Sequence, residues 1–256
     1  AQSARYQLLF QSIGLLFLLF ALPCFVFVHE PRRPERAFSL GSFKAAWQQL
    51  TLTVQSSQRY PGLVRFLLGR LLYADAINTA VLFMGIYVTQ ELGYGFDAGE
   101  AQLVLPVAVG FAIVGGLLWS QVTDRLGPKR TLTLVLWLWV VILGGAALIG
   151  QFKLPGVWFW GVALLSGIAL AGVWTADRPL LLRLTPPEQV GEFYGLYGMV
   201  GRFAAIMGPW LWAMVVDVWG FGRPAAMLVL MTAVVLSLIV LRPVSDAPRQ
   251  WAVETP

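Results

Sequence analysis

The feature that most constrains this chain is a series of long, almost uninterrupted apolar runs, of which 131-TLTLVLWLWVVILGGAALIG-150 is one. Each run has about the twenty residues that a helix needs to cross the hydrocarbon core of a bilayer. The runs are continuously apolar rather than alternating, which favours helices over the strands of a membrane barrel. We therefore expect an all-α polytopic membrane protein with about seven transmembrane spans: 8–29, 63–89, 101–120, 131–150, 155–176, 191–217 and 223–242.

The composition fits this class and gives little support to others. Charged residues make up 12% of the chain, about half the share usual in a soluble domain. The net charge of +5 comes from basic residues in short connectors, so we expect a lipid bilayer as partner and no nucleic acid. Cys24 and His29 are the only residues of their kinds, and we expect no metal site and no cofactor. Nucleotide-binding, hydrolase and metalloprotease motifs are missing, so we expect no enzyme.

The basic residues are distributed unevenly between the two sides of the predicted spans. Connectors on one side, with their flanks, carry most of the Lys and Arg residues, whereas the other side has only Arg5, Lys153 and Arg223, and its connector 90–100 is acidic. Short cytoplasmic loops are enriched in Lys and Arg. We therefore expect the N-terminus outside, the C-terminus in the cytoplasm, and a cytoplasmic location for 30–62, 121–130, 177–190 and 243–256.

The most polar interruption, 30–62, separates the first predicted span from the other six. Apolar residues recur at helical spacing over 41–57, which predicts an amphipathic helix on the membrane surface. A solvated connector that packs against the helices is an equally open interpretation.

An odd number of spans with an outside N-terminus fits a chain whose earlier spans are missing. Secondary transporters are often built from two six-span halves joined by a linker. We therefore expect four segments: 1–29, the last span of a missing first half; 30–62, the cytoplasmic linker; 63–242, a six-span C-terminal transporter domain; and 243–256, a cytoplasmic tail.

Three stretches resemble motifs of a known family. The connector 120-SQVTDRLGPKR-130 resembles the cytoplasmic signature loop of the major facilitator superfamily, in the form typical of its vacuole-effluxer-like, or "unknown major facilitator", branch. The stretches 68-LGRLLYADAINTAVLFMGIY-87 and 178-RPLLLRLTPPEQVGEFYGLYGMVGRFAAIMGP-209 resemble further motifs of that branch. Asp177 stands where this branch usually has a small hydroxyl residue. The resemblance implies one six-helix half of a major facilitator fold, transporter ancestry and a bacterial inner membrane.

The signature connector contains a candidate gate. Its acidic residue can pair with a neighbouring cation, or with the N-terminal amides of an adjacent helix, and so hold the cytoplasmic side closed. The other interpretation is that its positive charges only set the topology. The candidate gating residues are Asp124, Arg125, Gly127, Lys129 and Arg130.

Polar residues inside two predicted spans form a candidate pathway for solute or protons. Asp75, Asn78 and Thr79 share one helical face, whereas Arg70 is five residues from Asp75 and is a poor partner for it. Arg202 can bind an anionic solute group or pair with a carboxylate such as Asp75. The alternatives are a structural hydrogen bond for Asp75 and snorkelling to the surface for Arg202.

These features lead to two hypotheses for function. The first is part of a secondary active transporter that moves a small solute, an amino acid or a related metabolite, by alternating access. Its partner is the missing N-terminal half or another membrane subunit. The second is a transporter-derived scaffold or assembly subunit of a larger membrane complex, which moves no solute.

Overall fold

The computed structural model describes residues 2–27, 60, 62–91 and 98–247. It divides into two units, Ala1–Ala46 and Trp47–Pro256, and each is described by itself. The first contains α1, Gln2–Phe27, whose apolar segment Phe10–Phe25 lies within the predicted span 8–29. The amphipathic helix predicted over 41–57 lies outside the described residues.

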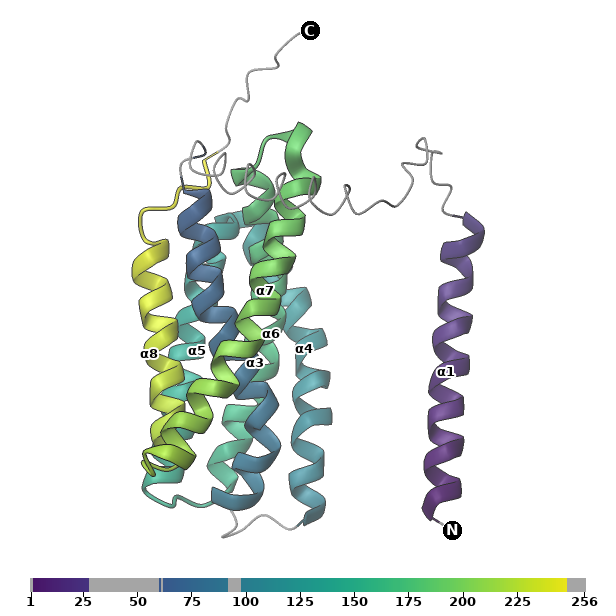
Figure 1. Ribbon diagram of the computed structural model, residues 1–256, viewed down its shortest axis with the longest axis vertical. Coiled ribbons are helices and arrows are strands. Elements are labelled where there is room, and N and C mark those ends of the chain that lie inside the picture. Colours follow the sequence, from purple (N-terminus) through teal and green to yellow (C-terminus); the bar gives the residue numbers. More distant parts are fainter. Residues whose placement is uncertain (1, 28–59, 61, 92–97, 248–256) are drawn as a thin grey trace, which may run out of the picture. The chain divides into compact units, whose positions relative to one another are not determined.

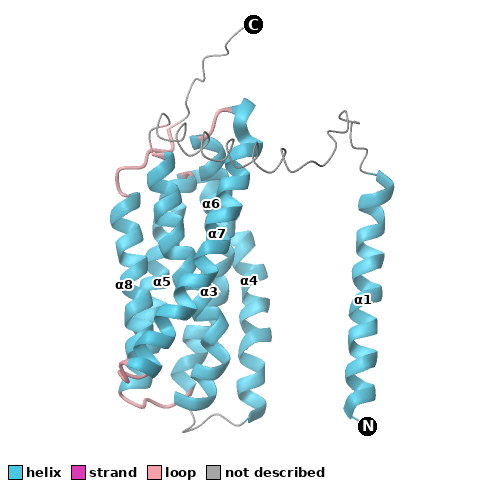
Figure 2. Ribbon diagram, viewed as in Figure 1, coloured by secondary structure: helices cyan, strands magenta, loops and turns pink. Residues whose placement is uncertain are grey.

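The second unit is a bundle of long helices, and the described part of the chain contains no strand (Figure 2). Six segments of this unit are long and apolar enough to cross a membrane. The chain is therefore an all-α polytopic membrane protein, as the apolar runs predict. The elements of the bundle are α3 (Leu63–Glu91), α4 (Ala98–Leu126), α5 (Pro128–Gln151), α6 (Val157–Leu184), η1 (Pro187–Gln189), α7 (Val190–Ala213), η2 (Met214–Val218, π-helical) and α8 (Arg223–Leu241).

Within the bundle, α3 and α6 each contact several other helices. The most extensive contact joins α4 to α6, while α3 packs on α7 and α8, and α5 packs on α6 and α8 (Figure 1). The close approach of α4 and α6 depends on Gly167, because a Cβ there would run into the backbone of Ala108. The Trp119 indole N–H strengthens this contact by donating to the Ile168 carbonyl, 3.0 Å away.

The connector between α4 and α5 is much shorter than 121–130. Both helices extend beyond the apolar runs, and only Gly127 lies between them. Its φ of 83° lies in the left-handed region that glycine adopts without strain, and Pro128 is well suited to the first turn of the next helix. The signature connector is thus a sharp corner between two helices.

Helix α6 extends eight residues beyond the predicted end of the fifth span at residue 176. The sequence predicts Asp177 and Arg178 in the cytoplasmic connector 177–190. In the structure α6 continues through both residues and through Pro179 to Leu184. The helix can continue because Asp177 has partners inside the bundle, which are described next.

Candidate functional site

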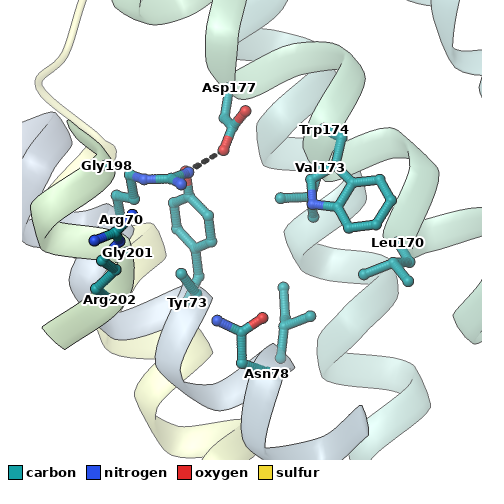
Figure 3. Close-up of a pocket in the computed structure, with 12 residues that line it drawn as sticks. Arg70, Tyr73, Asn78, Leu170, Val173, Trp174, Asp177, Gly198, Gly201 and Arg202 are labelled. Carbon is teal, nitrogen blue, oxygen red and sulfur yellow. Dashed lines mark hydrogen bonds and ion pairs between the residues drawn. The ribbon is translucent and has the colours of Figure 1, made fainter. Parts of the chain in front are cut away.

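A buried charged pair joins α3 and α6. The Arg70 guanidinium from α3 forms an ion pair and hydrogen bond with Asp177 Oδ2 from α6 (Figure 3). The Asp177 side chain is fully buried, and the Arg70 side chain is 13% exposed. A buried charge without a partner is strongly destabilising, so each of these residues requires the other.

Two tyrosines complete this arrangement, which we call the Asp177 cluster (Arg70, Tyr73, Asp177 and Tyr197). The Tyr197 hydroxyl from α7 donates to Asp177 Oδ2 at 2.9 Å, and the Tyr73 hydroxyl donates to the same oxygen at 3.4 Å. The Arg70 guanidinium also lies 3.4 Å from the centre of the Tyr197 ring, a cation–π contact. The cluster therefore ties together α3, α6 and α7.

Three members of the Asp177 cluster, Arg70, Tyr73 and Asp177, line a cavity, which we call the polar cavity. Its volume is about 260 Å³, and it lies between α3, α6 and α7. Besides members of the cluster, it is lined by Asn78, Leu170, Trp174 and Arg202 (Figure 3). Asn78 and Arg202 are both exposed, and Arg202 forms no ion pair with any carboxylate in the part of the chain that the structure describes.

The predicted pathway residues fall into two groups. Asn78 and Arg202 line the polar cavity, as a pathway would require, but Asp75 and Thr79 do not. Asp75 and Thr79 are buried against α7 instead, where Asp75 Oδ1 accepts a hydrogen bond from the Gly208 backbone N–H. This contact is the structural hydrogen bond that was the alternative to a pathway role for Asp75. A pairing of Asp75 with Arg202 is not present among the described ion pairs.

Gly208 allows α7 to approach α3 at this point. A Cβ on residue 208 would run into Thr79 Oγ1 and would lie 2.8 Å from Asp75 Oδ1. A side chain there would push the helices apart and break the hydrogen bond to Asp75. Gly208, which belongs to the G-P element of the motif that resembles the family, thus has a packing role.

The signature connector binds the C-terminal tail. The Lys129 backbone N–H at the start of α5 donates to Asp246 Oδ2 at 3.1 Å, and its ammonium donates to the Arg242 carbonyl at 2.9 Å. Arg183 from α6 approaches the same Asp246 oxygen at 3.6 Å. A carboxylate at a helix N-terminus satisfies free backbone amides and interacts favourably with the helix dipole.

The remaining gating candidates have no such partners. Asp124, Arg125 and Arg130 are exposed, and none forms an ion pair with another described residue. The carboxylate that meets helix amides at this corner is therefore Asp246 rather than Asp124. A gating role for the connector stays a prediction.

The residues of the Asp177 cluster were missing from the predicted site. Two signals for them were present in the sequence. Arg70 is a charged residue within a span, and Asp177 departs from the residue usual in the resembling family. Their pairing could not be found because 107 residues separate them. No group of three or more His, Cys, Asp or Glu that could hold a metal ion occurs among the described residues.

Comparisons with known proteins agree with the motifs. The uncharacterized MFS-type transporter YxiO of Bacillus subtilis (strain 168) is 27% identical over 220 residues, which cover 85% of this chain and 49% of that protein. Autophagy-related protein 22 of Coccidioides immitis (strain RS) is 25% identical over 233 residues, covering 83% of this chain and 38% of that protein. The chain thus spans about half the length, or less, of these relatives.

A family model described as vacuole effluxer Atg22 like matches residues 1–250, almost the entire chain. One relative of the chain, YxiO, is named as an MFS-type transporter. The match covers both the bundle and the helix that precedes it. The chain therefore belongs to the Atg22-like vacuole effluxer family.

Proposed function

We propose that the chain supplies one six-helix half of a secondary active transporter of the major facilitator type. In this proposal α3 to α8 form the C-terminal half, and the residues around α1 and the linker connect it to the first half. The transporter moves a small solute, an amino acid or a related metabolite, by rocking one half against the other. Six long apolar segments in one bundle and a relative named as an MFS-type transporter support this role.

The polar cavity is the observation that carries the proposal. A charged side chain within a span costs about 2.5–3.5 kcal/mol on insertion scales, so such residues usually line a pathway or have a partner. Arg70 has its partner in Asp177, but Arg202 has none among the described residues. Arg202 lines the cavity together with Asn78, and both side chains are exposed. Exposed polar side chains of this kind are expected at a binding site that a second six-helix half covers.

The proposal includes an orientation. The basic connectors lie in the cytoplasm, with the N-terminus of this chain outside and its C-terminus inside. The membrane is a bacterial inner membrane, and the partner is the other six-helix half. The C-terminal tail, held by Lys129 and Arg183 through Asp246, then lies on the cytoplasmic side.

Efflux from proteoliposomes tests the proposal. The full-length gene product, with both halves, is reconstituted into vesicles loaded with the twenty amino acids and a set of small carboxylic acids. Solute loss is followed by mass spectrometry against empty vesicles. We expect at least one solute to leave faster than from empty vesicles, and Arg202→Gln to slow its efflux at least tenfold. If no loaded solute leaves while the chain copurifies with a larger membrane complex, the scaffold hypothesis replaces this proposal.

A further inference from the structure

A groove lies between α5 and α8, at the end of the bundle where α5 begins and α8 ends. Its volume is about 410 Å³. The described residues that line it are Lys129 and Trp137 from α5, and Val235, Leu238, Ile239 and Arg242 from the last part of α8 and the residue that follows it. No residue of α5 or α8 lines the polar cavity. The groove is therefore a separate feature, on helices that the proposed transport site does not use.

The groove is basic at one end and apolar along the rest of its length. Lys129 is the second residue of α5, and its ammonium donates to the carbonyl of Arg242, which directly follows α8. Trp137 lies eight residues further along α5, roughly 12 Å away at 1.5 Å per residue. The side chains of Trp137 and Ile239 are 54% and 61% exposed, so the apolar part of the groove is open to the surroundings of the bundle.

The basic end of the groove has an excess of positive charge. None of the described residues that line it is acidic. The carboxylate that contacts this corner, Asp246, accepts from the Lys129 backbone N–H and is paired with the Arg183 cation. Three cations and one carboxylate thus meet here, and the Lys129 and Arg242 charges remain uncompensated among the described residues. Two N–H groups of the Lys129 ammonium and the whole Arg242 guanidinium are left to bind an anion.

An anionic phospholipid matches both parts of the groove. Basic pockets between transmembrane helices bind anionic lipid headgroups, and a phosphodiester can accept hydrogen bonds from a Lys and an Arg together. An acyl chain would cover the exposed side chains of Trp137 and Ile239, which a soluble anion would leave uncovered. A phosphatidylcholine headgroup has no net charge and therefore gains less from the two uncompensated cations. The match therefore favours an anionic lipid over both a neutral lipid and a free phosphate.

We propose that the groove between α5 and α8 binds one anionic phospholipid. The phosphate lies between the Lys129 ammonium and the Arg242 guanidinium, and an acyl chain lies along Trp137 and Ile239. The bound lipid joins the start of α5 to the end of α8, beside the tail segment that Asp246 holds. This site goes beyond the proposed transport function and does not depend on it, because the groove and the polar cavity have no residue in common.

Binding of single lipids, measured by native mass spectrometry, tests the inference. The full-length protein is delipidated in detergent and titrated with phosphatidylglycerol or with phosphatidylcholine that carries the same acyl chains. A Lys or Arg near an anionic lipid surface strengthens binding by about fivefold, so we expect the first phosphatidylglycerol to bind at least about tenfold more tightly. Lys129→Gln with Arg242→Gln should bring the two affinities to within about twofold. The control, Arg65→Gln with Arg125→Gln, removes two exposed charges that do not line the groove and should keep the preference.

Several outcomes would overturn the inference. Equal affinities for the two lipids would remove the charge preference, and an equal loss in the control variant would assign that preference to the general charge of the surface. Glycerol 3-phosphate that displaces phosphatidylglycerol at equal concentration would make the groove a site for soluble anions. Phosphatidylglycerol binding that requires removal of residues 248–256 would make the tail the occupant.

The single variant Arg242→Gln keeps the test valid if the double variant does not fold. The Arg242 side chain has no ion pair with a described residue, so its replacement should leave the melting temperature unchanged. We expect its affinity for phosphatidylglycerol to fall about fivefold, as for the loss of one cation. An unchanged affinity in this folded variant would contradict the proposal.

Discussion

Neutralising Asp177 is the most informative single change in the bundle. In Asp177→Asn the carboxylate is lost, and the largely buried Arg70 guanidinium keeps its charge without a compensating anion. Removing one partner of a buried ion pair typically costs about 3–5 kcal/mol, because the other charge remains buried. Since Asp177 is fully buried and Arg70 is only 13% exposed, solvent can relieve little of this cost. We expect a loss in that range in the free energy of unfolding.

The double variant tests whether the loss comes from the unpaired charge. Arg70→Gln together with Asp177→Asn leaves two neutral amides that can hydrogen-bond to each other and to the tyrosines. Replacing a buried ion pair by uncharged groups is often nearly neutral, so we expect the double variant to be more stable than either single variant. The unfolding free energies are measured in mixed micelles with increasing dodecyl sulfate, followed by the fluorescence of the 11 tryptophans.

The chain offers a matched control pair at the opposite end of α3. Arg223 and Glu91 are 2.9 Å apart but retain 28% and 24% exposure. Partly exposed ion pairs contribute about 0–1 kcal/mol, so Glu91→Gln should have little effect. If the two single losses at Arg70 and Asp177 simply add in the double variant, the pair is not coupled and our account of why α6 continues past residue 176 is wrong.

Three further changes test other parts of the structure by the same unfolding assay. Gly208→Ala should lower the free energy of unfolding by about 1–3 kcal/mol, because its Cβ would collide with Thr79 Oγ1. The control Gly195→Ala, on the same helix, meets nothing within 4 Å and should not destabilise. Equal losses in the two variants would refute the packing role of Gly208. Tyr197→Phe should cost about 1.5–3 kcal/mol, because a hydrogen bond to a buried carboxylate is lost. The cost should exceed that of Tyr73→Phe, because the Tyr73 hydroxyl forms the longer hydrogen bond to Asp177. The reverse order would contradict the geometry of the cluster. Asp246→Ala should cost about 0.5–2 kcal/mol, because the N-terminus of α5 loses its cap. Asp124→Ala, at an exposed position, should leave the stability unchanged. An equal loss in both variants would show that the tail is not the capping partner.

The spans could be predicted from the sequence because length and hydropathy alone determine them. The ends of the helices could not, because hydropathy shows where a run stops being apolar and not where the helix ends. Asp177 lies inside α6, where it forms an ion pair with Arg70, 107 residues away in the sequence. Such a pairing depends on how α3 and α6 pack, and a single sequence contains no direct record of that.

The polar stripe on α3 was predicted only in part for a geometric reason. Asn78 and Thr79 lie on either side of the Asp75 direction, because successive residues are rotated by about 100° around a helix. A stripe this wide spans two environments once neighbouring helices are in place. Asn78 meets the polar cavity, while Asp75 and Thr79 meet Gly208 of α7. Helical spacing gives the face of a residue, but the neighbour on that face comes from the tertiary packing.

Alternating access is the central claim of this account, and it can be tested without a known substrate. Asn78→Cys is introduced into the full-length protein without other cysteines, and a membrane-impermeant maleimide is added from the outer or the cytoplasmic side of oriented vesicles. The account predicts that residue 78 is labelled from both sides, because the polar cavity opens to each in turn. Labelling from one side only, or from neither, would contradict it.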